Sequence, residues 1–194
     1  TETDLQKFDI SSLKAYEGLK SSLNYFIFFY GPFGSLAKIN KPQDTSSRFF
    51  YLGTKSIEYI FGLKLLPPFV NDLIIAAGEK DVVNLHKHGY SAVSFSSETA
   101  TISDKQMSLL KARSNNIYLC YDIDDAGKSN AQKIKSTYPF VHIITLPEDL
   151  KKKSDFRGKP CADVADYFRC YNKEDFEKLI DEAKFYDIQI SNST

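Results

Sequence analysis

The sequence predicts an α/β protein in which helices flank a parallel sheet, preceded by a small aromatic-rich α+β subdomain. From residue 71 onward, short apolar runs alternate with helical patterns, as do the strands and crossover helices of a parallel sheet. Before residue 71, aromatic runs instead flank a turn that contains glycine and proline, which is typical of an antiparallel hairpin. The chain has 194 residues and a hydrophobic content of 42%, enough for one large domain or two small ones.

The N-terminal part is expected to contain three short strands, at residues 24–30, 35–39 and 48–52. Three cationic residues, Lys38, Lys41 and Arg48, alternate with the aromatic residues of these strands. Two interpretations are open for them. The cations could contact the phosphates of a nucleic acid while the rings stack on its bases, or they could be solvated side chains on the outer face of a strand.

The rest of the chain is expected to alternate between strand and helix. Strands are predicted at residues 73–77, 92–95, 117–121 and 141–146, and helices at 80–87, 103–113, 128–136 and 173–185. Ser103 is the expected N-cap of its helix, and Gly89 follows the helix before it, where a left-handed glycine commonly lies. With right-handed crossovers, this order places helices on both faces of the sheet. The predicted division is an N-terminal subdomain at 1–71, a parallel-sheet domain at 72–170, and a C-terminal helix and tail at 171–194.

Composition excludes several classes of protein. Lysine plus arginine and aspartate plus glutamate number 25 each, so a strongly basic nucleic-acid coat is excluded, although a local basic patch is not. The three cysteines form no C-x-x-C pair, and such a scattered set fits a reduced, cytoplasmic protein better than a secreted one. The longest apolar run, residues 25–30, is too short to span a membrane. The chain starts at Thr1 rather than Met, which indicates a piece of a longer protein.

The most informative segment is the acidic run at 121–127, which directly follows a predicted apolar strand. Side chains at i and i+2 of an extended chain point the same way. Asp122 and Asp124 are therefore expected to face one spot at the carboxyl end of the sheet, where open α/β folds bind ligands. Two carboxylates at one spot raise each other's pKa, a cost that a divalent cation removes, and paired hard oxygens suit Mg²⁺. The alternative is that one of them only caps the following helix. The cluster exceeds what capping needs, so we predict a metal site.

A rival motif overlaps this segment. Gly127-Lys128-Ser129 looks like the end of a nucleotide-binding P-loop, but that motif needs a glycine at position 122, where the chain has Asp122. A P-loop must also offer bare backbone N–H groups to phosphate, which carboxylates would repel without a metal between them. The sequence therefore argues against an ATPase loop.

Three segments, in this order, resemble the Toprim family, the metal-binding fold of bacterial-type primases, topoisomerases and some nucleases. Residues 78–81 follow the first strand, where the family has Glu-Gly-x-x-Asp, and residues 122–127 match its Asp-x-Asp motif with the Ala-Gly typical of primases. Residues 163–168 match the Lys-Asp-x-x-Asp-Tyr segment of primase Toprims, with Ala162 in place of lysine. The upstream segments also resemble the subdomain that precedes Toprim in phage-type and mobile-element primases; they lie at 38–42, 48–50 and 61–63.

One position departs from the family pattern. The family's glutamate at the end of the first strand, assigned to acid–base or metal-site chemistry, falls on Ala77. Glu79 lies two residues later. Glu98 follows the second strand, which ends at the same edge of a parallel sheet. We predict that Glu98 supplies the moved carboxylate, with Glu79 as its rival; the plainer interpretation of Glu98 is a loop residue or a charge at a helix N-terminus.

The resemblance implies the catalytic core of a DNA primase or primase-helicase, a nucleotidyltransferase that makes RNA primers on single-stranded DNA during replication with Mg²⁺ or Mn²⁺. It implies that Asp122 and Asp124 bind metal, that Asp81, Asp163 and Asp166 bind the metal or its waters, and that Glu98 or Glu79 acts as base or supports the site. The candidates for contacts to the template or to nucleoside triphosphates are Lys38, Lys41, Arg48, Lys80 and Lys128. A zinc ribbon upstream and a helicase downstream are expected from the family. Two alternatives stay open: a Toprim nuclease, and a catalytically degenerate module that binds DNA or protein.

Overall fold

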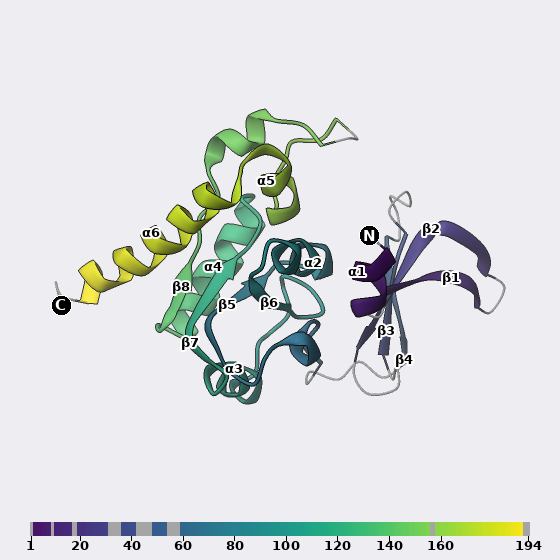
Figure 1. Cartoon of the computed structure of the whole chain (residues 1–194), viewed down its shortest axis with the longest axis horizontal. Helices are drawn as coiled ribbons and strands as arrows, with labels where there is room; N and C mark the ends of the chain where they lie inside the picture. Colours follow the sequence, from purple (N-terminus) through teal and green to yellow (C-terminus); the bar gives the residue numbers. More distant parts are fainter. Residues whose placement is uncertain are drawn as a thin grey trace.

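Two four-stranded sheets organise the computed structural model (Figure 1). The structure describes residues 2–8, 10–16, 19–30, 36–41, 48–53, 59–155 and 158–191. The predicted turn at 31–34 and the end of the predicted tail lie outside these residues. One sheet is antiparallel and is built before residue 54; the other is parallel and begins at Val70.

The antiparallel sheet pairs its strands in chain order: β1 (Ile10–Tyr16), β2 (Leu19–Tyr30), β3 (Leu36–Asn40) and β4 (Phe49–Gly53). Figure 1 shows it on the right, with the short helix α1 (Glu2–Lys7) beside it. The predicted antiparallel pairing of 24–30 with 35–39 is confirmed as β2 and β3, and the predicted strand at 48–52 is β4. The sequence did not predict β1, because Ile-Ser-Ser-Leu-Lys-Ala-Tyr carries few large apolar side chains.

The parallel sheet has the strand order β6-β5-β7-β8, and all its pairs are parallel, as predicted. Its strands are β5 (Val70–Ala76), β6 (Ser91–Ser94), β7 (Ser114–Cys120) and β8 (Val141–Ile143). The ends of β5 and β7 are buried on both faces, which explains why they read as continuous apolar runs rather than as an alternating pattern.

Helices cover both faces of the parallel sheet. Ile74, Ala76 and Tyr118 face one cluster of buried residues, which receives side chains from α2 (Glu79–Lys87), α5 (Val164–Cys170) and α6 (Lys173–Ser191). Leu73 and Ile75 face the opposite cluster, which receives α3 (Asp104–Lys111) and α4 (Asp125–Thr137). The alternation follows from the two-residue period of a strand, and the prediction of helices on both faces is confirmed.

Capping residues set most helix boundaries. Ser103 accepts a hydrogen bond from Gln106 N, completing a capping box, and Gly89 has φ of +90°; both predictions are confirmed. Helix α4 begins at Asp125, three residues earlier than predicted, and α6 continues to Ser191. Two short 3₁₀ helices, η2 (Leu63–Leu65) and η3 (Glu148–Lys152), and helix α5 were not predicted.

The two sheets share one hydrophobic core. The Phe61 ring lies 5.7 Å from that of Phe8 and 5.8 Å from that of Phe28, measured between ring centroids. Phe61 N also donates to Ser94 O at 2.9 Å, which ties this connecting segment to the edge strand β6. The N-terminal sheet is therefore held against the parallel sheet close to the ends of β5 and β6.

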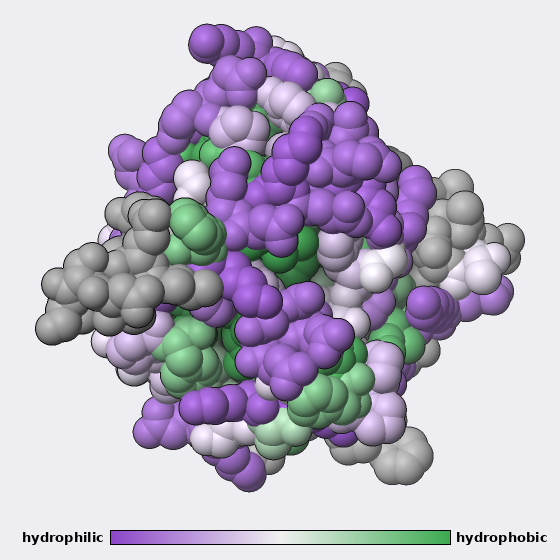
Figure 2. Space-filling view, turned by 60° about the vertical axis from the view of Figure 1, so that its left-hand side comes forward, coloured by the Kyte–Doolittle hydropathy of each residue, from purple (hydrophilic) through white to green (hydrophobic). Residues whose placement is uncertain are grey.

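The visible face of the molecule in Figure 2 is largely hydrophilic, with apolar residues confined to small patches and a central recess. Among the helices of the described ranges, none combines the length and the apolar character that a membrane span requires.

Candidate active site

The candidate active site lies at the carboxyl edge of the parallel sheet. Ala76 of β5 is level with Ser94 of β6 and Cys120 of β7 in the strand register, so the segments that follow these three residues leave the sheet side by side. Those segments carry most of the acidic residues singled out in the sequence. The parallel topology therefore brings residues distant in the sequence to one edge, as expected for an open α/β fold.

Asp122 is the most electrostatically crowded carboxylate of this edge. Burial, followed by the neighbouring carboxylates of Asp81, Glu98 and Asp163, raises the pKa of Asp122 to about 8, with Asp124 adding the smallest contribution. Like charges held together in a partly buried place favour the protonated acid unless a cation joins them. The carboxylates that crowd Asp122 most thus come from three other segments, rather than from Asp124 two residues away.

Asp124 caps helix α4. Gly127 N donates to Asp124 Oδ1 at 2.8 Å, so the capping role that the sequence left open for one of the pair belongs to Asp124. Capping engages one carboxylate oxygen and is compatible with a cation at the other. The expectation that Asp122 and Asp124 face one spot as on an extended strand is therefore modified, because the chain bends at Ile123 and Asp124, just before helix α4 begins at Asp125.

Glu98 reaches this edge from the loop after β6. Its Oε1 accepts a hydrogen bond from the backbone N–H of Asp122 at 3.2 Å. An aspartate carboxylate lies within about 5 Å of its own backbone nitrogen, so the Glu98 and Asp122 carboxylates lie within about 8 Å of each other. Burial raises the pKa of Glu98, and the charge of Asp124 raises it further, while the bond from Asp122 N lowers it.

Glu79, the rival of Glu98, is occupied elsewhere. It is only 4% exposed and is bonded to Lys38 Nζ of strand β3 at 2.9 and 3.0 Å. Lys38 is 5% exposed, so the sequence interpretation of this lysine as a solvated side chain is wrong, and little of it can face a nucleic acid. A lysine on a strand is usually exposed; the packing of the N-terminal sheet on helix α2 buries this one.

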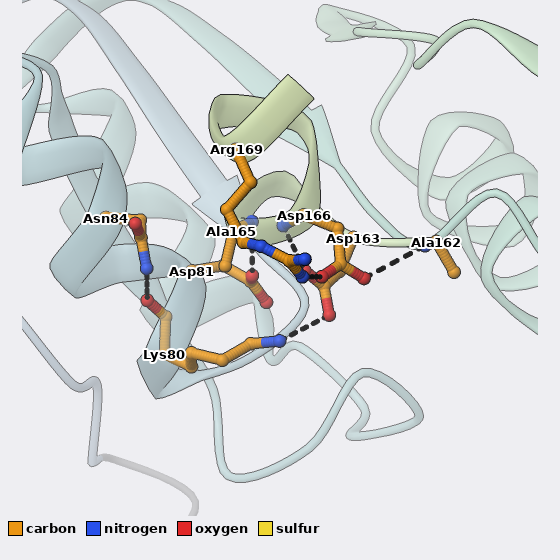
Figure 3. A network of polar contacts seen from close by, with 8 residues as sticks. All are labelled: Lys80, Asp81, Asn84, Ala162, Asp163, Ala165, Asp166 and Arg169. Atoms are coloured by element: carbon orange, nitrogen blue, oxygen red, sulfur yellow. Dashed lines mark hydrogen bonds and ion pairs between the residues drawn. The ribbon is translucent and has the colours of Figure 1, made fainter. Parts of the chain in front are cut away.

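Asp81, Asp163 and Asp166 belong to a network that joins helices α2 and α5 (Figure 3). Asp81 Oδ1 accepts from Ala165 N at 3.2 Å, and burial, followed by the charge of Asp163, raises the pKa of Asp81 to about 7. Lys80 is ion-paired with Asp163, which also caps α5 by accepting from Asp166 N at 2.9 Å. The network therefore places two of the predicted metal-site carboxylates, Asp163 and Asp166, against cations.

Asp166 itself accepts hydrogen bonds from Arg169 at 3.0 Å and from Ala162 N at 3.2 Å. Ile123 N donates to Ala162 O at 3.0 Å, which fastens the loop of Asp122 to the segment before α5. This backbone link explains why the third acidic motif, some forty residues later in the sequence, comes next to the second.

The remaining predicted cations are Lys128, Arg48 and Lys41. Lys128 is exposed and paired with Glu148. Arg48 and Lys41 lie over aromatic rings of β4, at 5.1 Å from Phe49 and 5.0 Å from Phe50 respectively. Phe49 is 43% exposed and also has Lys38 Nζ 4.6 Å from its ring centroid, whereas Phe50 points to the opposite face of the strand. The predicted interleaving of cations and aromatics therefore exists at Lys41 and Arg48.

The acidic edge is suited to a divalent cation that takes only a few of its ligands from the protein. Among the described residues, no group of three or more His, Cys, Asp or Glu side chains is arranged to hold a metal on its own. Mg²⁺ is usually bound by one or two carboxylates together with waters and substrate phosphates, so the pair Asp122 and Asp124 matches its needs. The raised pKa of Asp122 is the observation that favours a cation here.

Gly127 is required by the close approach of the acidic loop to helix α4. A Cβ atom at this position would lie 2.2 Å from Asp122 O and 2.7 Å from Glu98 Oε1. Any larger residue would therefore displace both the loop of Asp122 and the carboxylate of Glu98. This contact gives a physical reason for the glycine that follows the acidic pair.

The raised pKa of Asp122 predicts how stability depends on pH. The folded protein keeps this proton up to about pH 8, whereas an unfolded chain releases it near pH 4. The folded state therefore binds more protons in this window, and the free energy of unfolding should fall, by on the order of 1–3 kcal/mol, between about pH 4 and 8 in the absence of divalent ions.

Asp122→Asn should flatten this pH dependence of the unfolding free energy, measured by urea titrations at a series of pH values. Asp149→Asn, at a carboxylate bonded to Tyr171 on the surface, is the control; an equal slope in Asp122→Asn and the parent would contradict the assignment.

Comparisons with known proteins agree with this description. Residues 71–145 match the model of the Toprim domain. The DnaG catalytic core is similar with a TM-score of 0.70 at 18% identity, covering 94% of this chain and 69% of that chain. The primase fragment of the bacteriophage T7 primase-helicase protein is similar with a TM-score of 0.63 at 17% identity, covering 94% and 70%.

A DnaG primase catalytic domain bound to single-stranded DNA is similar with a TM-score of 0.68 at 17% identity, covering 94% of this chain and 70% of that chain. No curated protein was found to match in sequence. These likenesses concern the fold, and they confirm both the predicted resemblance and the small subdomain in front of the parallel sheet. The chain therefore contains a Toprim domain, at residues 71–145, within the fold of bacterial and phage primase catalytic cores.

Proposed function

We propose that the protein is a metal-dependent primase catalytic core, which joins ribonucleotides into short primers on single-stranded DNA. The observation that carries the proposal is the convergence of Asp81, Glu98, Asp122 and Asp163 at the carboxyl edge of a Toprim sheet. The primase-like subdomain in front of the sheet favours synthesis over cleavage, because the similarity to primase cores covers 94% of the chain. We also propose a cytoplasmic protein that works with a helicase domain or partner.

Mg²⁺ or Mn²⁺, when bound, would supply electrostatic stabilisation of the charge that develops during phosphoryl transfer. We propose that Asp122 and Asp124 hold this ion. Asp81 and Asp163, whose charges act on Asp122, would act on the water molecules of the ion, while Asp166 would support the network through its contact with Arg169.

Glu98 is proposed as the base that accepts the proton of the attacking hydroxyl. Glu98 accepts a hydrogen bond from Asp122 N, whereas Glu79 forms a buried ion pair with Lys38. A carboxylate with a raised pKa is a better proton acceptor near neutral pH than an ordinary one. This assignment argues against the non-enzymatic alternative, since Glu98 would supply the carboxylate missing at Ala77 from the loop after β6.

A primer-synthesis assay tests the proposed function. The protein, a single-stranded template, ribonucleoside triphosphates and Mg²⁺ or Mn²⁺ should yield short RNA, and Asp122→Asn should lower the yield by about 100-fold or more. Calorimetric titration with Mn²⁺ should show weakened binding in Asp124→Asn, which keeps the helix cap because asparagine caps as well as aspartate. Asp149→Asn should change neither result. Cleavage of DNA without synthesis would instead indicate a nuclease, and template binding without either reaction would indicate a non-catalytic module.

Strand β4 is proposed as part of the surface that holds the template. Phe49→Ala should weaken binding of single-stranded DNA by about 1–3 kcal/mol, because an exposed ring that stacks on a base contributes roughly this much. Arg48→Ala should weaken binding and also lower its dependence on salt, because a phosphate contact releases counterions. Fluorescence anisotropy at two salt concentrations measures both effects. Phe140→Ala, at an exposed ring beyond α4, is the control, and equal losses in both phenylalanine variants would contradict this surface.

A further inference from the structure

We propose that Lys38 and Tyr51 of the N-terminal sheet are positioning residues for Glu98, through the backbone carbonyl of Ser96. The inference rests on the proposed function of Glu98, and it gives the N-terminal subdomain a role in the chemistry of the Toprim edge. Neither Tyr51 nor Ser96 carries a signal in the sequence that would mark it as part of a site.

The carbonyl oxygen of Ser96 is the point where the two sheets meet. Tyr51 Oη of β4 donates to it at 2.7 Å, and Lys38 Nζ of β3 donates to it at 3.0 Å. Lys38 cannot move freely, because it is 5% exposed and is also bonded to both carboxylate oxygens of Glu79. Two donors from a rigid sheet therefore fix one backbone oxygen of a loop that has no regular secondary structure.

The chain between Ser96 and Glu98 transmits this constraint over a short distance. Ala100 N donates to Ser97 O at 3.0 Å, closing a tight turn with Glu98 inside it. Glu98 then accepts from Asp122 N at 3.2 Å. The turn is held at Ser96 on one side and at the backbone of Asp122 on the other, which leaves the Glu98 side chain little freedom.

The sheet topology explains why the Glu98 loop needs hydrogen bonds from outside the loop. Strand β5 lies between β6 and β7, so Glu98 must cross the end of β5 to reach Asp122, a span of about 10 Å at the usual strand spacing. The residue after the end of β5 is Ala77, whose small side chain leaves room for this crossing. A carboxylate carried directly by β5 would be positioned by the sheet itself, whereas one carried by a loop depends on outside contacts.

Backbone amide hydrogen exchange tests the proposal without metal or substrate. Loss of one hydrogen bond to Ser96 O in Tyr51→Phe should lower the protection of the Asp122 amide by about five- to tenfold, since a typical hydrogen bond has this effect on a local equilibrium. Glu98→Ala gives the reference for complete loss of the bond to Asp122 N. The amide of Leu119, within β7, should be unchanged in both variants.

A second measurement follows Mn²⁺ affinity by calorimetry, which should weaken by a similar factor in Tyr51→Phe if Glu98 contributes to the site. The matched control is Tyr171→Phe, which removes a 2.9 Å hydrogen bond to Asp149 at the C-terminal end of α5 and should leave both readings unchanged. An Asp122 amide that responds to Glu98→Ala but not to Tyr51→Phe would overturn the positioning role while leaving the proposed function intact. Altered exchange in Tyr51→Phe in a protein that makes no primers would reject the function and keep the structural link.

Discussion

Glu98→Gln should lower primer synthesis by about 100-fold or more, because removal of a general base typically costs 10²- to 10⁴-fold in rate. The change keeps the size of the side chain and an oxygen that can accept from Asp122 N, so the fold and the loop should persist. Glu79→Gln should cost far less at a temperature where the protein stays folded. Rates measured with saturating template and nucleotides give the comparison. A large loss in Glu79→Gln with little loss in Glu98→Gln would return the role of base to Glu79.

A rescue experiment makes this prediction sharper. The resemblance to Toprim proteins aligns Ala77, one residue beyond the end of β5, with the family's glutamate. If the carboxylate has moved from β5 to the loop after β6, Ala77→Glu should recover part of the activity lost in Glu98→Gln. Ala77→Gln in the same background provides the matched control, since it adds the same bulk without a charge. Equal activity of the two double variants would contradict the idea of a moved carboxylate.

Lys38→Met should destabilise the protein by about 3–5 kcal/mol, because it removes the ammonium group that pairs with the buried carboxylate of Glu79. The double variant Lys38→Met/Glu79→Met should recover most of this loss, since replacing a buried ion pair by apolar side chains of similar size is often neutral or stabilising. Urea unfolding followed by circular dichroism measures the free energies. Lys128→Met, which breaks an exposed pair with Glu148, should change stability by less than about 1 kcal/mol.

The outcome of the double variant separates two roles of this ion pair. Recovered stability with weakened protection of the Asp122 amide would agree with Lys38 as a positioning residue, since its bond to Ser96 O is still missing. A double variant as unstable as Lys38→Met would instead show that the energetic assignment of the pair is wrong.

Local signals in the sequence were enough to predict the parallel sheet and the Toprim domain. Several local signals predicted their structures correctly, because each structure depends on residues close together in the sequence. These signals are the apolar runs before Ala76 and Cys120, the capping box at Ser103 and the glycine at 89. The order of the acidic motifs along the chain carried the resemblance to Toprim proteins, and the common edge of parallel strands predicted that these motifs meet.

Which task each acidic residue has depends on long-range packing. The pattern Asp-x-Asp did not reveal that Asp124 caps α4 while Asp122 takes the crowded position, because the chain turns between the two residues. Lys38 looked like a surface cation, and its burial depends on how one sheet packs against another. Glu98 could be proposed from the sheet edge alone. Its hydrogen bond from Asp122 N, however, joins residues 24 apart in the sequence, and the bond from Tyr51 to Ser96 O in its loop joins residues 45 apart. Local patterns specify strands, caps and motifs, whereas long-range packing fixes which carboxylate meets which partner.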